Sequence, residues 1–275
     1  MRIPDWIVLL LVLSVVLWAL FSGGKEADAP EAPPDIFSEV GPLLPDPDQY
    51  DEQVLVQVGE ISDGIGTAFA LDTDGVWMTA RHAVDGCESV GLAFGGGRVL
   101  PVSELRTSPE SDIALLYTRR APRMLKFTDR NDLRVGETGF HVGYPQGQPG
   151  EVTSRLLSRS KLVTRGRYRN EEPVLAWAEM GRTRGLNGTL AGISGGPVFD
   201  ANGGVVGVTV AESPRRGRIY TTAPKSVSRV LSQNQLESGE GRALSIDLAT
   251  YGREADRLRR ELSVVKVICR ADNEA

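Results

Sequence analysis

The sequence contains little histidine and little cysteine, with 2 residues of each among its 275. A reaction that needs an imidazole base therefore has only His82 and His141 to draw on. Cys87 and Cys269 allow one disulfide at most, and two free thiols fit the count equally well. Lysine and arginine are dispersed, and no basic block interleaved with aromatic residues is present, so nothing indicates nucleic-acid binding.

The composition is that of an ordinary folded body, with 41% hydrophobic residues and a net charge of −5. The length allows one or two domains with a sizeable core. No internal repeat is visible.

The first 24 residues differ from the rest. Between Trp6 and Phe21, Ser14 is the only polar residue in a run of 16. With its flanks, this run is long enough to cross a bilayer as an uncleaved helical anchor. A signal peptide cut near Ser22–Gly24 is the alternative. Because Arg2 favours an inside N-terminus, both readings place the body outside the cytoplasm, and we expect a single-pass bacterial inner-membrane protein with its body in the periplasm or outside the cell.

Residues 25–48 contain six prolines and several acidic residues, which is typical of an extended linker. The predicted protease body occupies residues 49–235. Residues 236–275 form a tail of unknown role, in which a helix is expected over 248–262 and a strand over 263–268.

The body is predicted to be all-β, because short apolar runs alternate with glycine-rich turns. The runs form two groups divided near residues 120–134, which suggests two packed six-stranded antiparallel β-barrels at about 49–120 and 135–223. A helix beginning at Pro224 follows them. The predicted strands are Gln53–Val58, Gly64–Leu71, Val76–Ala80, Ser89–Phe94, Arg98–Val102, Ile113–Tyr117, Phe140–Val142, Val152–Val163, Val174–Glu179, Pro197–Phe199, Val205–Val210 and Ile219–Thr222.

The most informative stretch is Gly192-Ile193-Ser194-Gly195-Gly196-Pro197. Glycines on both sides of a serine permit a sharp turn and leave backbone N–H groups free to face an oxyanion. The alternative is a glycine-rich hairpin in which Ser194 only caps a turn. The stretch also fits the nucleophile elbow of α/β-hydrolases, but their histidine follows the serine. Because no histidine follows Ser194, that fold is excluded.

The remaining order is histidine, aspartate, serine. His82 ends an apolar strand, and Asp112 directly precedes another one. A carboxylate beside a core strand needs a partner, and an imidazole N–H is a suitable one. His141, within Gly139–Gly143, is predicted to be a packed strand histidine.

The motifs Thr79-Ala80-Arg81-His82, Asp112-Ile113-Ala114-Leu115 and Gly192–Pro197 resemble the three catalytic motifs of trypsin-like, chymotrypsin-fold serine proteases. The resemblance spans about residues 50–235. Gly143-Tyr144-Pro145 and the helix after Pro224 are similar to the bacterial HtrA/DegP-like branch, in which an anchor or signal peptide precedes the protease domain. Members of that branch usually carry a PDZ domain afterwards, and the 40 residues after Gln235 are too few for one.

The resemblance implies a role for each matching residue. Ser194 would attack the peptide carbonyl, His82 would transfer the proton, and Asp112 would orient His82. The N–H groups of Gly192 and Ser194 would form the oxyanion hole. No cofactor or metal is expected.

Two departures from digestive relatives also follow. Ile193 stands where those enzymes have the aspartate that pairs with a newly cut N-terminus, so zymogen-type activation is not expected. Gly188 stands where trypsin-like specificity would place an acid. Thr209, Val210 and Ala211 would line the first specificity pocket, which suggests small or medium aliphatic substrate residues.

The predicted function is a serine endopeptidase of the bacterial cell envelope that forms an acyl-enzyme on Ser194. Its partners would be a protein or peptide substrate and, through the N-terminal helix, the membrane. The alternative is a catalytically silent protease-fold module that binds an envelope protein. The oligomeric state is not specified by the sequence.

Overall fold

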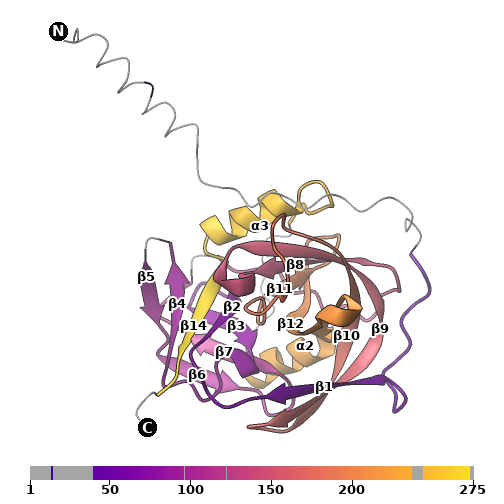
Figure 1. The fold of residues 1–275 in the computed structure, drawn as a ribbon, viewed down its shortest axis with the longest axis horizontal. Coiled ribbons are helices and arrows are strands. Elements are labelled where there is room, and N and C mark those ends of the chain that lie inside the picture. Colours follow the sequence, from indigo (N-terminus) through magenta and orange to yellow (C-terminus); the bar gives the residue numbers. More distant parts are fainter. Residues whose placement is uncertain (1–13, 15–39, 96, 122, 237–243, 273–275) are drawn as a thin grey trace, which may run out of the picture.

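The computed structural model describes Ser14 and residues 40–95, 97–121, 123–236 and 244–272. Two seven-stranded sheets form the body, and two α-helices pack against them (Figure 1). The helices are α2 (Pro224–Gln233) and α3 (Tyr251–Arg260), and short 3-10 turns lie at η1 (Arg81–Ala83), η2 (Pro145–Gly147) and η3 (Pro214–Arg216).

The first sheet has the strand order β5-β4-β14-β2-β3-β7-β6. All its pairings are antiparallel. Its strands are β2 (Gly64–Ala70), β3 (Val76–Ala80), β4 (Ser89–Phe94), β5 (Arg98–Pro101), β6 (Glu104–Thr107), β7 (Ile113–Tyr117) and β14 (Val264–Arg270).

The second sheet has the order β1-β9-β10-β13-β12-β11-β8, and β8 also pairs with β9. The pairing of β8 with both β11 and β9 closes strands β8 to β13 into a ring, outside which β1 runs parallel to β9. The strands are β1 (Glu52–Val58), β8 (Thr138–Gly143), β9 (Gly150–Gly166), β10 (Asn170–Arg182), β11 (Pro197–Phe199), β12 (Val205–Ser213) and β13 (Arg218–Thr222).

The division of the chain between the sheets differs from the prediction of two six-stranded antiparallel units. Residues 52–58 pair with β9 of the second sheet, although they were assigned to the first unit. The first sheet instead takes β14 from the C-terminal tail, which lies between β4 and β2 (Figure 1). The reason is physical: alternating apolar residues identify a strand but not the edge with which it pairs.

The two sheets share an apolar core that also includes the helices. Phe69 and Met78 of the first sheet pack in the same cluster as Phe140 and Phe199 of the second. Tyr251 of α3 enters this cluster, with its ring 5.6 Å from that of Phe140. The tail is therefore part of the folded body.

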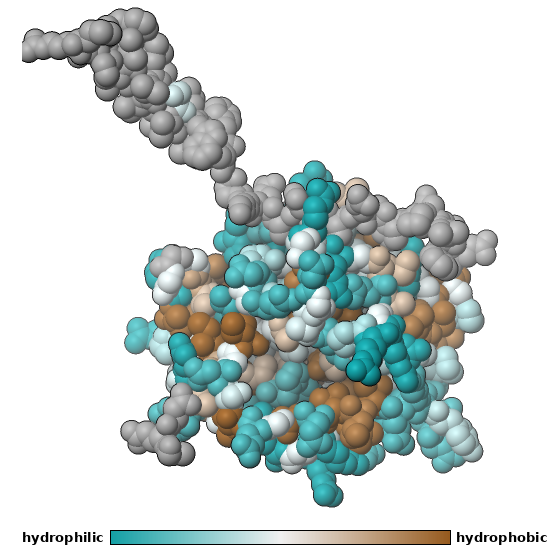
Figure 2. Space-filling model, viewed as in Figure 1, coloured by the Kyte–Doolittle hydropathy of each residue, from teal (hydrophilic) through white to brown (hydrophobic). Residues whose placement is uncertain are grey.

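α3 is amphipathic, as its sequence pattern requires. Its buried residues Tyr251, Ala255 and Leu258 recur at helical spacing, and they face the shared core. Hydrophilic residues cover the region of α3 on the face drawn in Figure 2. Among the described residues, no helix is long and apolar enough to cross a membrane. The predicted membrane segment, apart from Ser14, lies outside the described residues.

Candidate active site

His82 and Asp112 meet at one end of the first sheet. β3 and β7 are antiparallel neighbours, with Ala80 opposite Ile113. His82 lies two residues after Ala80 and Asp112 one residue before Ile113, so the strand register brings both side chains to the same edge. His82 Nδ1 lies 2.6 Å from Asp112 Oδ2, and the His82 backbone N–H donates to Asp112 Oδ1 at 2.9 Å. The pair fixes the ring so that Nε2 is the free nitrogen.

The pKa of His82 reflects two opposing influences. Burial lowers it, because a charged imidazolium is poorly solvated there. The negative charge and hydrogen bond of Asp112 outweigh burial, so the pKa lies above the usual 6.5, although Arg167 opposes this rise. A ring with a raised pKa is a stronger proton acceptor than a free histidine.

Asp112 has two further partners that sequence reasoning missed. Tyr168, in the β9–β10 hairpin, donates its hydroxyl to Asp112 Oδ1 at 2.9 Å. The Arg81 guanidinium lies 3.8 Å from the centre of the Tyr168 ring and holds that ring against the site. The Asp112 N–H donates to Glu172 Oε1 at 2.5 Å. Both carboxylate oxygens of Asp112 and its backbone N–H are thus engaged.

Glu172 is a buried acid beneath Asp112. Its side chain is 1% exposed, and its Oε2 has no hydrogen-bond partner among the described residues. Burial raises the pKa of Glu172 well above its usual value, and the nearby charge of Asp112 raises it further. Burial therefore favours the neutral, protonated form of Glu172.

Glycine is required on both sides of Ser194. Gly192 and Gly195 have φ values of 99° and 88°, in the left-handed region. A Cβ on Gly195 would lie 2.1 Å from Thr67 O, and one on Gly192 would lie 2.5 Å from Tyr144 O. Only glycine allows the neighbouring backbone to approach this closely.

Two backbone carbonyl groups just before Ser194 accept hydrogen bonds from backbone N–H groups. Ala191 O accepts from Gln146 N–H at 2.6 Å, and Ile193 O accepts from Gly196 N–H at 2.8 Å. In a planar trans peptide the C=O and the following N–H point in opposite directions. The N–H groups of Gly192 and Ser194 are therefore turned away from these contacts, and they have no acceptor among the described residues.

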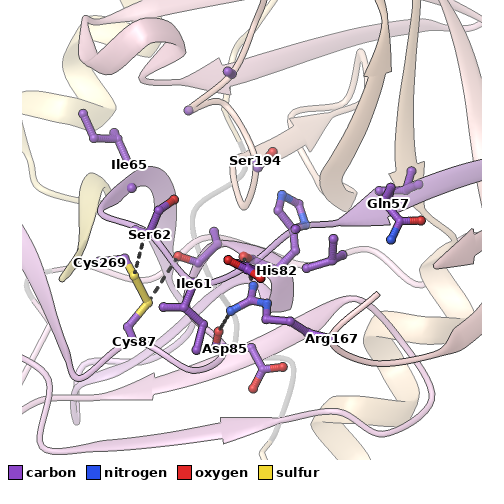
Figure 3. Close-up of a pocket in the computed structure, with 18 residues that line it drawn as sticks. Gln57, Ile61, Ser62, Ile65, His82, Asp85, Cys87, Arg167, Ser194 and Cys269 are labelled. Carbon is purple, nitrogen blue, oxygen red and sulfur yellow. Dashed lines mark hydrogen bonds between the residues drawn. A yellow bond between two sulfur atoms is a disulfide. The ribbon is translucent and has the colours of Figure 1, made fainter. Parts of the chain in front are cut away.

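A cavity of about 310 Å³ joins these groups, and its lining includes His82, Gly192 and Ser194. Figure 3 shows Ser194 next to the His82 ring, with Arg167 on the other side of His82, towards Asp85. Within the described part of the chain, no hydrogen bond joins Ser194 Oγ to His82, a contact that in such sites often forms only when substrate binds. The residues that carry a hydroxyl, an imidazole paired with a carboxylate, and two N–H groups without an acceptor among the described residues thus line one space.

Comparison with known proteins identifies the family of the chain. The sequence model of the trypsin-like peptidase domain matches residues 66–208, just over half of the chain. The chain belongs to the trypsin-like peptidase family.

Relatives in this family include bacterial envelope proteases. A probable periplasmic serine endoprotease, DegP-like, of Bartonella henselae is 30% identical over 180 residues, covering 63% of this chain and 34% of that protein. The periplasmic pH-dependent serine endoprotease DegQ of Escherichia coli is 26% identical over 187 residues, covering 65% of this chain and 38% of that protein. The chain thus spans little more than a third of the length of these relatives.

Solved structures share the fold. The active form of the Rv3671c protease from M. tuberculosis superposes with a TM-score of 0.51 and 18% identity, covering 68% of this chain and 86% of that one. This likeness supports a chymotrypsin-like arrangement of the two sheets.

In this trypsin-like domain, a disulfide joins Cys87 and Cys269, the pair for which the sequence left both states open. It links the segment after η1 to β14. Both cysteines lie in the wall of the cavity, on the side away from Gln57 in Figure 3. Among the described residues there is no group of three or more His, Cys, Asp or Glu side chains that could hold a metal ion.

The residues predicted for substrate specificity occupy different surroundings. Thr209 and Val210 are 1% and 2% exposed, and both backbone groups of Thr209 bond the loop that carries Ser194, at Gly195 and Gly196. Ala211 is half-buried. Thr209 therefore supports the loop from behind, which its sequence position did not reveal.

Sequence reasoning missed Glu212, the residue after Ala211. Glu212 connects β12 to the segment around Gly188, which was also predicted to line the specificity pocket. Its carboxylate accepts from Leu190 N–H at 2.8 Å and from the Thr189 hydroxyl. Gly188, the next residue back, has a φ of 76° and its carbonyl accepts from Arg182 Nη1 at 2.8 Å. Glu212 thus spans the space between β12 and the loop before Ser194.

His141 lies in the interior of the second sheet, fully buried. Its Nδ1 is 3.2 Å from Thr209 Oγ1 and its Nε2 is 2.8 Å from Ser154 Oγ. Burial without a charged partner lowers the pKa of His141 to about 3. It is a neutral packing residue with both ring nitrogens engaged.

Proposed function

We propose that the chain is a serine endopeptidase in which Ser194 is the nucleophile, His82 the general base and Asp112 the residue that orients His82. The observation that carries this proposal is the shared cavity, which His82, already paired with Asp112 at 2.6 Å, lines together with Ser194. The order and identity of these residues match the family to which the chain belongs.

The reaction follows from the atoms present. Ser194 Oγ adds to the carbonyl carbon of a peptide bond while its proton passes to His82 Nε2. The imidazolium, stabilised by Asp112, gives that proton to the departing amine as the C–N bond breaks. Water then adds to the acyl-enzyme in the same way, and the acid product leaves Ser194 with its hydroxyl restored.

The oxyanion formed in both steps would bind the N–H groups of Gly192 and Ser194. Because these donors have no acceptor among the described residues, they are available without rearrangement. One such donor is worth about 3–4 kcal/mol of transition-state stabilisation.

Activity would not require a newly cut N-terminus. Ile193, at the position of the aspartate that receives one in digestive relatives, is 2% exposed and packs in an apolar cluster with Leu190 and Val198. The loop is thus held by packing and backbone hydrogen bonds, and no ion pair to a chain terminus is needed.

The first specificity pocket would be formed by Gly188, Ala211 and Glu212. Glu212 already bonds Thr189 and Leu190, which narrows the space that a substrate side chain can enter. Small or medium aliphatic side chains are therefore the proposed preference.

We also propose that the protein acts in the bacterial envelope, tethered to the inner membrane by residues 6–21. The apolar run of 16 residues with one serine supports the anchor, and the printed names of the relatives supply the periplasmic location.

A fluorophosphonate probe, which phosphonylates activated serines, tests the enzyme proposal. The wild type should react at one serine, mapped by mass spectrometry to Ser194, and Ser194→Ala should not react. The matched control is Ser103→Ala, because Ser103 is exposed and distant from the cavity lining; it should react like the wild type. If the wild type does not react, or if Ser194→Ala reacts equally, the enzyme proposal fails and the alternative of a catalytically silent binding module is favoured.

A further inference from the structure

We propose that the C-terminal segment 244–272 keeps the oxyanion loop, residues 187–195, in its working form, and that it acts through the turn at Gln146. This inference rests on the proposed function, since the loop matters only if Ser194 acts as a nucleophile. Gln146, Lys266 and Arg259 are the positioning residues through which the tail, whose role the sequence left unknown, would act.

Gln146 is the residue that holds the oxyanion loop. Its N–H donates to Ala191 O at 2.6 Å, and its side-chain Nε2 donates to Asn187 O at 2.6 Å and to Thr189 O at 2.8 Å. The contact to Ala191 O sets the peptide plane that carries the Gly192 N–H. If this peptide rotated, that N–H would leave the oxyanion hole.

The Gln146 turn adopts a conformation that its own sequence does not favour. Gln146 has a φ of 53°, which places a residue with a side chain in the left-handed region. Such a conformation is unfavourable for a residue with a side chain and persists only where surrounding contacts impose it. The turn is therefore expected to need external support.

The tail supplies that support at both ends of the turn. Lys266 of β14 donates from Nζ to Gly147 O at 3.2 Å. Arg259 of α3 donates from Nη2 to Gly150 O at 2.7 Å and to Glu151 Oε2 at 2.6 Å. Its guanidinium also lies 5.8 Å from the centre of the Tyr144 ring. Two basic side chains from the tail thus bind carbonyls on the C-terminal side of Gln146, and Arg259 also approaches the Tyr144 ring on its N-terminal side.

A second connection runs through β2, the strand beside β14. Thr67, opposite Lys266 in the sheet, donates from Oγ1 to Gly192 O at 2.7 Å and from its N–H to Ser194 O at 2.8 Å. Its Oγ1 also accepts from Tyr144 N–H at 3.0 Å. β14 therefore contacts both elements that hold the oxyanion loop, namely β2 and the turn at Gln146.

The choice of variants follows from burial. Glu151 is fully buried, so removing the Arg259 charge would leave an uncompensated carboxylate and could unfold the chain. Lys266→Met keeps the side-chain stem and removes only the Nζ contact, and Gln146→Ala removes the side-chain contacts to Asn187 and Thr189. Arg270→Gln is the matched control: it lies on β14, but its side chain bonds Asp63, away from the turn.

Two readouts on the full chain separate the possible results. Steady-state hydrolysis of a peptide substrate gives kcat and KM, and hydrogen exchange of the peptide covering residues 187–196 reports the loop whether or not the protein is active. We expect kcat to fall about 10- to 100-fold in Gln146→Ala and about 3- to 10-fold in Lys266→Met, with KM changed less than twofold, since misplaced oxyanion donors act on the transition state. Exchange should quicken in residues 187–196 in both variants and stay unchanged in Arg270→Gln.

Two results would overturn the inference. One is wild-type kcat and exchange in Lys266→Met, whatever the result for Gln146→Ala, because the tail would then not act on the loop. The other is faster exchange throughout the chain, which would mark a general loss of stability. If the wild type proves inactive, the proposed function fails, while the exchange data still decide whether the tail controls the loop.

Discussion

The two histidines of the chain differ in their exposure and in their hydrogen-bond partners. The His82 side chain is 23% exposed at the edge of the first sheet and is paired with Asp112, whereas His141 is fully buried between two hydroxyl groups in the second. The pKa of His82 is raised, because Asp112 outweighs burial, and that of His141 is lowered to about 3, because burial acts alone.

This contrast shows which surroundings would suit a histidine to act as the proposed base. Both rings lie near the loop that carries Ser194: Thr209 bonds both His141 and that loop, and His82 lines the same cavity as Ser194. What separates them is a charged partner for one nitrogen and open space for the other. The predictions below test each part of that difference.

The largest effect on activity should come from replacing one of the two histidines by glutamine, with the other left intact. His82→Gln is expected to lower kcat/KM at least about 10⁴-fold, because the proton of Ser194 then has no acceptor. His141→Gln should change kcat/KM only a few-fold but lower the free energy of unfolding by about 1–3 kcal/mol, because a buried hydroxyl loses its partner. Peptide hydrolysis and urea denaturation measure the two quantities. Equal loss of activity in both variants would contradict the assignment.

Asp112→Asn should lower kcat by about 10⁴-fold, as for serine-protease triads in general. The amide can donate to His82 Nδ1 and so favours the tautomer with the proton on Nε2, where it cannot accept the Ser194 proton. Single-turnover acylation should report this loss, and the ¹⁵N spectrum should show the changed tautomer. An Asn variant that acylates at the wild-type rate would remove Asp112 from the site.

Tyr168→Phe should have a smaller effect, about 3- to 10-fold on kcat with KM unchanged, because it removes one hydrogen bond to Asp112 and leaves the His82 contact. The ring stays in place against Arg81, so folding should be unaffected. A change confined to KM, or a fall in Tm, would mean that Tyr168 only shapes the cavity.

Glu172→Gln should leave kcat within about twofold, because a glutamine has the charge of a protonated glutamate. Stability should respond to pH in a definite direction. A folded-state pKa above the unfolded value makes the wild type lose stability as pH rises from about 4.5 towards the raised pKa, by up to about 1.4 kcal/mol per pH unit. The glutamine variant should lack this decline. Parallel Tm curves between pH 4 and 9 would show that Glu172 is ionised.

Much of this site could be predicted from local sequence. His82, Asp112 and Ser194 lie in short motifs beside strands whose ends the glycine-rich turns mark, and the helix expected to begin at Pro224 does begin there. Glu172 left a usable signal, since alternation along β10 turns it inward with Asn170 and Val174.

Other features left no such signal. Tyr168, Gln146 and Arg259 act through contacts between segments far apart in sequence, which strand and turn patterns do not encode. The same holds for the sheets that β1 and β14 join. The sequence of each segment predicts a strand, but the strand with which it pairs depends on the packing of the whole chain.

The most direct test of the account is a ¹⁵N NMR titration of both imidazole rings, set against the pH dependence of Ser194 acylation by a fluorophosphonate. We predict that His82 titrates above the usual 6.5, that His141 stays neutral down to about pH 4, and that the acylation rate rises with pH through the His82 titration. An acylation rate that does not follow the titration of His82, or a His141 ring that titrates in its place, would contradict the central claim.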